Sequence, residues 1–171
     1  PMDTVCGFEM AKGLGELGGL GIIHRFNPIE DQLQGMLELE ELNIPYGVAV
    51  GVGEKAEHRI DQLLSWTNLN VMCIDVAHGH HAMMKNALKN LRSMFSNDVH
   101  IMAGNVATLD GFNALADAGA TSIRVGVGGG SICSTRIQTG HGIPTLHSVL
   151  ECAASESDAL LIADGGIKNS G

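Results

Sequence analysis

The sequence predicts an α/β protein built on the (β/α)8 (TIM) barrel plan, and three observations support this. Short apolar runs alternate with amphipathic stretches at a spacing of roughly 25–30 residues. The apolar runs are almost continuous, which is typical of parallel strands covered on both faces. Polar or glycine-rich signals follow every run, as in a barrel, whereas a doubly wound open sheet would favour one switch point.

The order of the expected elements follows from this alternation. The expected strands are Leu20–His24, Tyr46–Val52, Asn70–Val76, Val99–Asn105, Ser122–Gly126 and Ala159–Asp164. The expected helices are Phe8–Leu17, Pro28–Leu42, Glu54–Trp66, His81–Phe95, Leu109–Ala118 and Thr145–Ser155. In the second helix, Pro28 suits the first turn, Asn27 is the expected cap, and Glu30 and Asp31 complement the positive helix end.

We expect residues 1–171 to be part of a single barrel, an incomplete fragment with about six full strand–helix units. The chain begins as if inside a longer protein, after a first strand ending near Pro1. It stops at Gly171, where a helix should begin. An eighth strand is therefore expected beyond the last residue.

Composition and charge narrow the class of protein. The chain is 44% hydrophobic and carries a net charge of −9, without a basic run. This disfavours a nucleic-acid partner, although backbone N–H groups at helix starts can still bind a small anion. No apolar run is long enough to span a membrane, and no secretion signal is evident.

The four cysteines indicate a reducing compartment, and we expect a cytoplasmic protein. They show no CxxC pairing, which argues against a structural zinc site. Cys6, Cys73 and Cys152 lie in apolar or helical contexts, where a small buried thiol is the ordinary interpretation.

Cys133 differs because it lies at the end of a glycine-rich loop that follows an apolar strand. The loop reads Gly126-Val-Gly-Gly-Gly-Ser-Ile-Cys133-Ser-Thr-Arg136. A second such loop, Asp164-Gly-Gly166, follows the next strand along the chain. Glycines allow close approach of backbone to a ligand, and an exposed thiol of lowered pKa is a nucleophile. We therefore expect covalent catalysis on a phosphorylated substrate.

The segments that bear these signals resemble the IMP dehydrogenase / GMP reductase family over nearly the whole chain. The matching segments are Pro1-Met-Asp-Thr-Val5, Gly21-Ile-Ile-His-Arg25, Asp75-Val-Ala-His-Gly-His80, Ala103-Gly-Asn-Val106, Gly128-Gly-Gly-Ser-Ile-Cys-Ser-Thr-Arg136 and Ile162-Ala-Asp-Gly-Gly-Ile167. The cysteine loop and the Asp-Gly-Gly strand together are the most specific part of the resemblance.

The resemblance implies roles for the substrate site. Cys133 would attack C2 of the purine of IMP, and Thr135 would assist proton transfer beside it. Ser131 and the N–H groups of Gly165 and Gly166 would hold the 5′-phosphate. Asp164 would accept hydrogen bonds from the ribose, and Met2 would pack beside the purine.

The resemblance also implies a nicotinamide cofactor, NAD or NADP, and a potassium ion. Asp75, Asn105 and Gly126 would lie on the cofactor side. Carbonyl groups of Gly128, Gly130 and Cys133 would bind the monovalent cation. The intact protein would be a homotetramer. The resembled pattern carries a proline where this chain has Gly129, which we expect to make the free loop more flexible.

Three functions stay open at this point. The first, which most motifs favour, is NAD-dependent oxidation of IMP to XMP. The second is NADPH-dependent reduction of GMP to IMP by the same cysteine, favoured by Thr139-Gly-His-Gly-Ile-Pro144 and by the absence of a CBS pair between Arg25 and Gly47. The third is a barrel that binds a nucleotide without catalysis. The family's flap, second phosphate loop and water-activating arginine would lie beyond Gly171.

Overall fold

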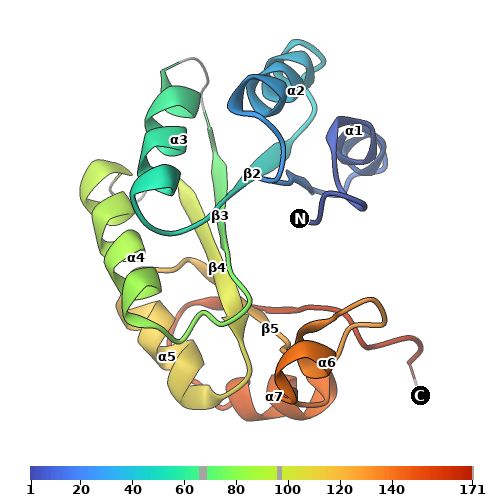
Figure 1. The fold of residues 1–171 in the computed structure, drawn as a ribbon, viewed down its shortest axis with the longest axis vertical. Helices are drawn as coiled ribbons and strands as arrows, with labels where there is room; N and C mark the ends of the chain where they lie inside the picture. Colours follow the sequence, from blue (N-terminus) through green and yellow to red (C-terminus); the bar gives the residue numbers. More distant parts are fainter. Residues whose placement is uncertain (66–68, 96–97, 171) are drawn as a thin grey trace. The chain divides into compact units, whose positions relative to one another are not determined.

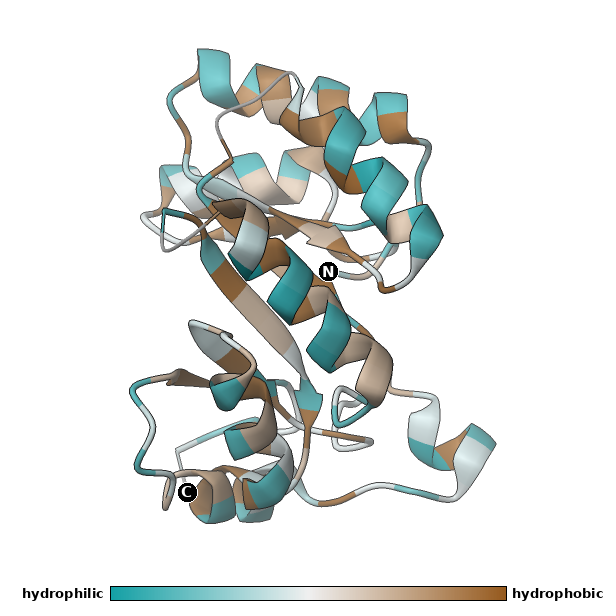
Figure 2. Ribbon diagram, turned by 90° about the vertical axis from the view of Figure 1, so that its left-hand side faces the viewer, coloured by the Kyte–Doolittle hydropathy of each residue, from teal (hydrophilic) through white to brown (hydrophobic). Residues whose placement is uncertain are grey.

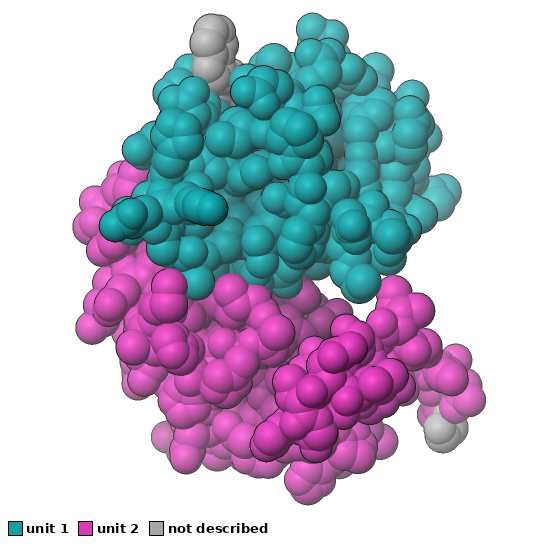
Figure 3. Space-filling model, in the orientation of Figure 1, with its two compact units in different colours: residues 1–75, 97–100 teal, residues 76–96, 101–171 magenta. Residues whose placement is uncertain are grey.

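The computed structural model describes residues 1–65, 69–95 and 98–170. The chain forms two compact units, which are described separately below (Figure 3). The first unit comprises Pro1–Asp75 and Asn97–His100, and the second comprises Val76–Ser96 and Ile101–Gly171. No helix in these described ranges is both long and apolar enough to cross a membrane.

The first unit alternates helices with strands (Figure 1). Its elements are α1 (Phe8–Glu16), β1 (Gly21–Ile23), α2 (Ile29–Glu41), β2 (Tyr46–Val50), α3 (Glu54–Leu64) and β3 (Val71–Asp75). β2 pairs in parallel with both β1 and β3. Every residue of β2 is buried, as expected for a parallel strand covered on both faces.

The second unit continues the alternation. Its elements are α4 (Ala82–Phe95), β4 (His100–Val106, of which the first residue is counted with the first unit), α5 (Leu109–Asp117), β5 (Ser122–Val125), α6 (Thr135–Thr139), α7 (Thr145–Cys152) and β6 (Leu160–Ala163). β5 pairs in parallel with both β4 and β6 and is buried throughout. Helices of this unit turn apolar residues toward its strands (Figure 2).

The predicted α/β class and all six strands are confirmed. Within each unit the strands follow chain order, β1-β2-β3 and β4-β5-β6, without the reversal that marks a doubly wound sheet. Closure into eight strands stays a prediction. The sequence did not predict α6, and the expected extension of α3 to Trp66 falls outside the described residues.

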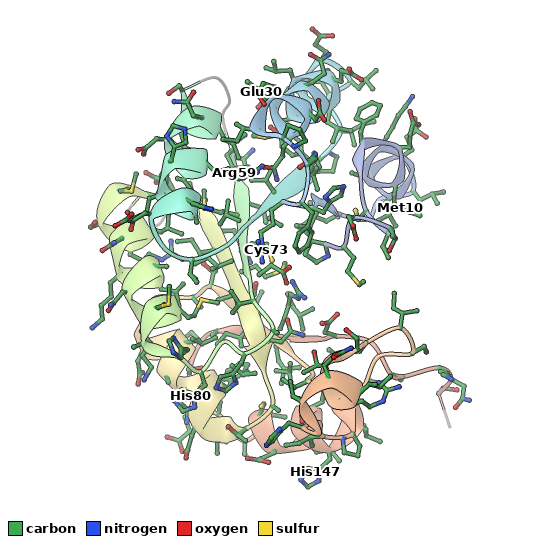
Figure 4. All side chains as sticks on the ribbon, in the orientation of Figure 1. Met10, Glu30, Arg59, Cys73, His80 and His147 are labelled. Atoms are coloured by element: carbon green, nitrogen blue, oxygen red, sulfur yellow. The ribbon has the colours of Figure 1, made fainter. Side chains whose placement is uncertain are left out.

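The predicted cap of α2 is wrong. Pro28, not Asn27, occupies the N-cap position, and no side chain caps the helix. The backbone oxygen of Asn27 instead accepts a hydrogen bond of 2.9 Å from Nη2 of Arg59 on α3 (Figure 4). Nη1 of Arg59 donates to Oε1 of Gln32 at 2.8 Å. Arg59 of α3 therefore bonds both to the chain just before α2 and to a residue in its first turn.

The buried side chain of Gln32 links α2 to the C-terminal ends of two strands. Its Nε2 donates to the backbone oxygens of His24 at 3.1 Å and Ala49 at 3.0 Å. A buried amide that finds such partners avoids the cost of desolvation. Gln32 therefore fixes the edge at which β1 and β2 end.

Packing of α1 on β1 leaves no room for a side chain at position 21. A Cβ added to Gly21 would lie 2.3 Å from the Cα of Ala11, whereas one added to Gly13 on α1 meets nothing within 4 Å. We expect Gly21→Ala to lower the free energy of unfolding by about 1–3 kcal/mol, because the helix must shift. Gly13→Ala should leave it unchanged or raise it by up to about 1 kcal/mol. Urea unfolding measures both, and equal effects would contradict this packing.

Candidate active site

Two loops of the second unit form the candidate site. We call residues 126–134, between β5 and α6, the cysteine loop, and residues 164–166, after β6, the aspartate loop. Val125 is paired in register with Ala163, and the N–H of Asp164 donates to the oxygen of Val125 at 2.9 Å. The parallel pairing of β5 and β6 therefore brings the starts of the two loops together.

The two loops approach each other closely through backbone atoms. A Cβ at Gly126, where φ is +148°, would lie 2.6 Å from the oxygen of Asp164. A Cβ at Gly166, where φ is +79°, would lie 2.7 Å from the oxygen of Gly129. Both the conformation and the close approach require glycine at these positions.

Cys133 is half-buried at the end of the cysteine loop and has a lowered pKa. Hydrogen bonds from the side chain and the backbone of Thr135 are the main causes, and they outweigh the raising effect of partial burial. The positive charge of Arg136 adds to the lowering. The thiolate fraction at neutral pH is therefore raised, which is what a nucleophilic thiol requires.

The other three cysteines are buried thiols, as the sequence predicts. Cys73 lies in β3 of the first unit (Figure 4). Burial, with a smaller contribution from Glu151, raises the pKa of Cys152 to about 11. Cys133 is thus the one cysteine of the four whose surroundings favour reaction.

Asp164 is held by two polar side chains from neighbouring strands. Nη2 of Arg124 on β5 donates to Oδ2 of Asp164 at 3.3 Å. Nδ2 of Asn105 on β4 donates to the same oxygen and, at 2.7 Å, to the backbone oxygen of Gly126. Arg124 and Asn105 are 8% and 7% exposed. Among the described residues, both hydrogen bonds to this carboxylate use Oδ2, which leaves Oδ1 for a ligand.

Asn105 has a second feature that suits a ligand. Its Oδ1 is buried and has no hydrogen-bond partner within the described parts of the chain. Buried acceptors are normally satisfied, so an orphaned one next to a candidate site marks a place for an N–H or O–H donor. Two backbone hydrogen bonds hold the segment after β3 against this residue. The N–H of Val76 donates to the oxygen of Gly104, and the N–H of Gly79 donates to the oxygen of Asn105.

The three carbonyl groups predicted to bind a monovalent cation do converge, but on an arginine. Nη1 of Arg136 lies 2.5 Å from the oxygen of Gly128, 2.8 Å from that of Gly130 and 3.3 Å from that of Cys133. Carbonyl oxygens are suitable donors for potassium. With the guanidinium group in this position, the three carbonyl oxygens already face a cation. The predicted potassium ion therefore does not fit beside it.

The structure brings together most of the residues that the sequence singles out. The aspartate loop and the cysteine loop hold Gly126, Gly128, Gly130, Ser131, Cys133, Asp164, Gly165 and Gly166, and Thr135 follows directly on α6. Met2 and Asp75 belong to the first unit. There, the backbone oxygen of Met2 accepts from Cys6, and that of Asp75 accepts from Nε of Arg25.

Three further residues of the site were not predicted. Arg124 could have been predicted from the sequence, because it is a charged residue in the otherwise apolar strand Ser122–Val125 and a buried charge requires a partner. Neither Arg136 nor Thr145 carries such a signal, since Arg136 bonds to loop backbone and Thr145 packs against Gly129. Thr145 begins α7 and is 4% exposed, and its hydroxyl has no partner within the residues that the structure describes.

Comparisons with known proteins agree with these features. A family model described as "IMP dehydrogenase / GMP reductase domain" matches residues 1–171. The chain is 43% identical over 136 residues to inosine-5′-monophosphate dehydrogenase of Aquifex aeolicus, covering 78% of this chain and 27% of that protein. It is 46% identical over 127 residues to the protein of the same name from Haemophilus influenzae, covering 73% and 26%.

A relative with another name matches to a similar degree. A protein named GMP reductase from Leishmania major is 42% identical over 128 residues, covering 73% of this chain and 26% of that protein. The chain spans about a quarter of the length of these three relatives.

Removing the hydroxyl of Thr135 should reduce the reactivity of Cys133. Thr135→Val deletes the side-chain hydrogen bond that is the largest cause of the lowered pKa. The pKa then rises, the thiolate fraction near neutral pH falls, and the alkylation rate by iodoacetamide drops several-fold, with an unchanged plateau at high pH. Thr139→Val, the same change at the end of α6, is the control. A pH profile identical to that of the wild type would contradict the assigned cause.

Gly129 and Thr145 should be energetically coupled. A Cβ at Gly129 would lie 2.2 Å from Oγ1 of Thr145, so this contact requires a glycine. We expect Gly129→Ala to destabilise the protein by about 1–3 kcal/mol, and most of this loss to disappear when Thr145→Ala is also present. Urea unfolding of the two single variants and the double variant measures the coupling. Additive effects would show that the two residues do not meet.

Proposed function

Because this chain belongs to the IMP dehydrogenase / GMP reductase family, we propose that the protein oxidises IMP to XMP at C2 of the purine, with Cys133 as the nucleophile and NAD as the cofactor. The observation that carries the proposal is the contact between the cysteine loop and the aspartate loop. It brings a thiol of lowered pKa and an anchored carboxylate into the same unit.

Cys133 begins the reaction. The Cys133 thiolate attacks C2, forming an S–C2 bond, and the hydrogen on C2 departs with its bonding electrons as a hydride. NAD, when bound, supplies the acceptor for that hydride. Water then adds to C2, the S–C2 bond breaks with its electrons returning to sulfur, and XMP is released with a proton. The hydrogen bonds of Thr135 favour the thiolate at the first step and stabilise it as the leaving group at the last.

The aspartate loop and the cysteine loop also provide groups for the nucleotide. Oδ1 of Asp164 accepts hydrogen bonds from ribose hydroxyls, while Arg124 and Asn105 hold Oδ2. The N–H groups of Gly165 and Gly166 and the exposed hydroxyl of Ser131 suit the 5′-phosphate, since backbone N–H groups can bind phosphate in a chain of negative net charge.

The cofactor side of the proposal is supported by a single orphaned atom. The buried Oδ1 of Asn105 can accept a hydrogen bond from a bound nicotinamide cofactor, and Gly126 lies beside that amide. Asp75 is part of the same proposal, as are a cytoplasmic location and assembly as a homotetramer. The role of Asp75 and the homotetramer rest on the family alone, and the cytoplasmic location rests on the cysteine pattern of the sequence.

Reduction of GMP to IMP is the second candidate, because one similar protein bears the name GMP reductase. In that direction the same cysteine would displace ammonia from C2 of GMP. A hydride, for which NADPH would be the source when bound, would then add to C2, and the S–C2 bond would break with its electrons returning to sulfur. Most of the relatives compared carry the name inosine-5′-monophosphate dehydrogenase, which favours the oxidation of IMP.

The assay follows the absorbance of the reduced nicotinamide. We expect the protein to produce NADH from IMP and NAD, and Cys133→Ala to reduce the rate by about 10³-fold or more, because the covalent step is lost. Mass spectrometry after denaturation during turnover should find a purine nucleotide attached to the peptide that contains Cys133.

Cys152→Ala is the matched control, since this buried thiol with a raised pKa should not react. It should keep most of the activity. NADPH consumption with GMP would replace the proposal with the reductase. Nucleotide binding without turnover in either direction would indicate a non-catalytic nucleotide-binding barrel, and activity that persists in Cys133→Ala would rule out the cysteine mechanism.

A further inference from the structure

Backbone oxygens of the cysteine loop face the guanidinium group of Arg136, a residue that is exposed overall. The carbonyl oxygens of Gly128, Gly130 and Cys133 all point at Nη1, at 2.5, 2.8 and 3.3 Å. This nitrogen has two hydrogens, so the two shorter contacts are full hydrogen bonds and the third is a weaker, shared one. Three acceptors from one loop thus converge on one cationic atom.

The loop is shaped to admit the stem of this side chain. A Cβ on Gly128 or on Gly142 would lie 3.2 Å from the Cβ of Arg136, so both glycines leave space for it. Gly128 has a φ of +78° and approaches the backbone of Gly142. The short helix α6 begins at Thr135 and places Arg136 in this gap.

Electrostatics explains why the position needs a cation. Three carbonyl dipoles directed at one point create a negative potential, which is how proteins bind monovalent metal ions through backbone oxygens. The guanidinium of arginine is charged at every relevant pH, so Arg136 meets the same requirement without a metal ion. The same three oxygens cannot coordinate a metal ion while they accept hydrogen bonds from Nη1.

We propose that Arg136 is the resident cation of the cysteine loop and competes with potassium for the carbonyl oxygens of Gly128, Gly130 and Cys133. With Arg136 in place, the loop keeps its conformation without a metal ion. A potassium ion enters only when the guanidinium leaves. Arg136 is thereby a positioning residue for Cys133, and the loop has two mutually exclusive cationic occupants.

Hydrogen exchange of the cysteine loop tests this directly. The purified protein and Arg136→Met, which keeps an apolar stem and removes the charge, are compared in KCl and in choline chloride of equal ionic strength. We expect loop amides of the wild type to exchange equally slowly in both salts. In Arg136→Met they should exchange at least about tenfold faster in choline, because three contacts are lost, and KCl should restore slow exchange.

Two further variants distinguish the effect of a positive charge at position 136 from the effect of removing any surface charge. Arg136→Lys keeps a cation and should be partly protected without potassium. Lys89→Met removes a charge from the exposed face of α4 and should behave as the wild type. Potassium binding is measured by its competition with thallium in thallium-205 NMR. The potassium concentration that displaces half of the bound thallium should be at least about tenfold lower in Arg136→Met than in the wild type, because the competing cation is gone.

Either of two results would overturn the proposal. One is slow loop exchange in Arg136→Met without potassium, which would show that the arginine does not hold the loop. The other is potassium binding that is equal or weaker in this variant, which would show that there is no competition. Neither readout uses turnover or a nucleotide, so the result is independent of whether Cys133 reacts with IMP.

Discussion

The register between β5 and β6 is the constraint on which the candidate site depends. Val125 is paired with Ala163, so Gly126 and Asp164 leave the sheet at the same level and the backbones of the two loops meet. A shift of one residue would move Asp164 away from Gly126 and turn the other side of β6 toward the core. The positive-φ glycines are a consequence of this register, because side chains there would force the loops apart.

An ion pair between the buried Arg124 and the partly exposed Asp164 ties a third strand to that arrangement. Arg124 on β5 lies in an otherwise apolar strand, where an unpaired charge would be strongly destabilising. Asp164 from the end of β6 and the amide of Asn105 from β4 complete the group. The carboxylate is therefore oriented by residues of the core, which makes it a rigid acceptor. The same core that stabilises the unit thus fixes the position of this carboxylate.

Arg136 links the shape of the cysteine loop to the chemistry of its thiol. Its guanidinium organises three carbonyl groups, and its charge also lowers the pKa of Cys133. Thr135, one residue earlier, donates to the same sulfur. Adjacent residues of the short helix α6 therefore act on one thiol, one by hydrogen bonding and the other by charge and loop geometry. A change of occupant at the carbonyl groups would alter both properties of the loop together.

By itself, the sequence determined the alternation of strands and helices, the two glycine-rich loops and the distinction between Cys133 and the other cysteines. These follow from local periodicity and local composition, and they agree with the structure to within a few residues at each element. Only the tertiary structure decided the partners of Asn27, Gly129 and Arg136. Arg59 reaches Asn27 from 32 residues away, and the contacts of Gly129 and Arg136 depend on backbone positions that α6, α7 and β6 supply. Such contacts leave no pattern in the sequence, because they depend on where the fold brings a hydroxyl or guanidinium group against the backbone.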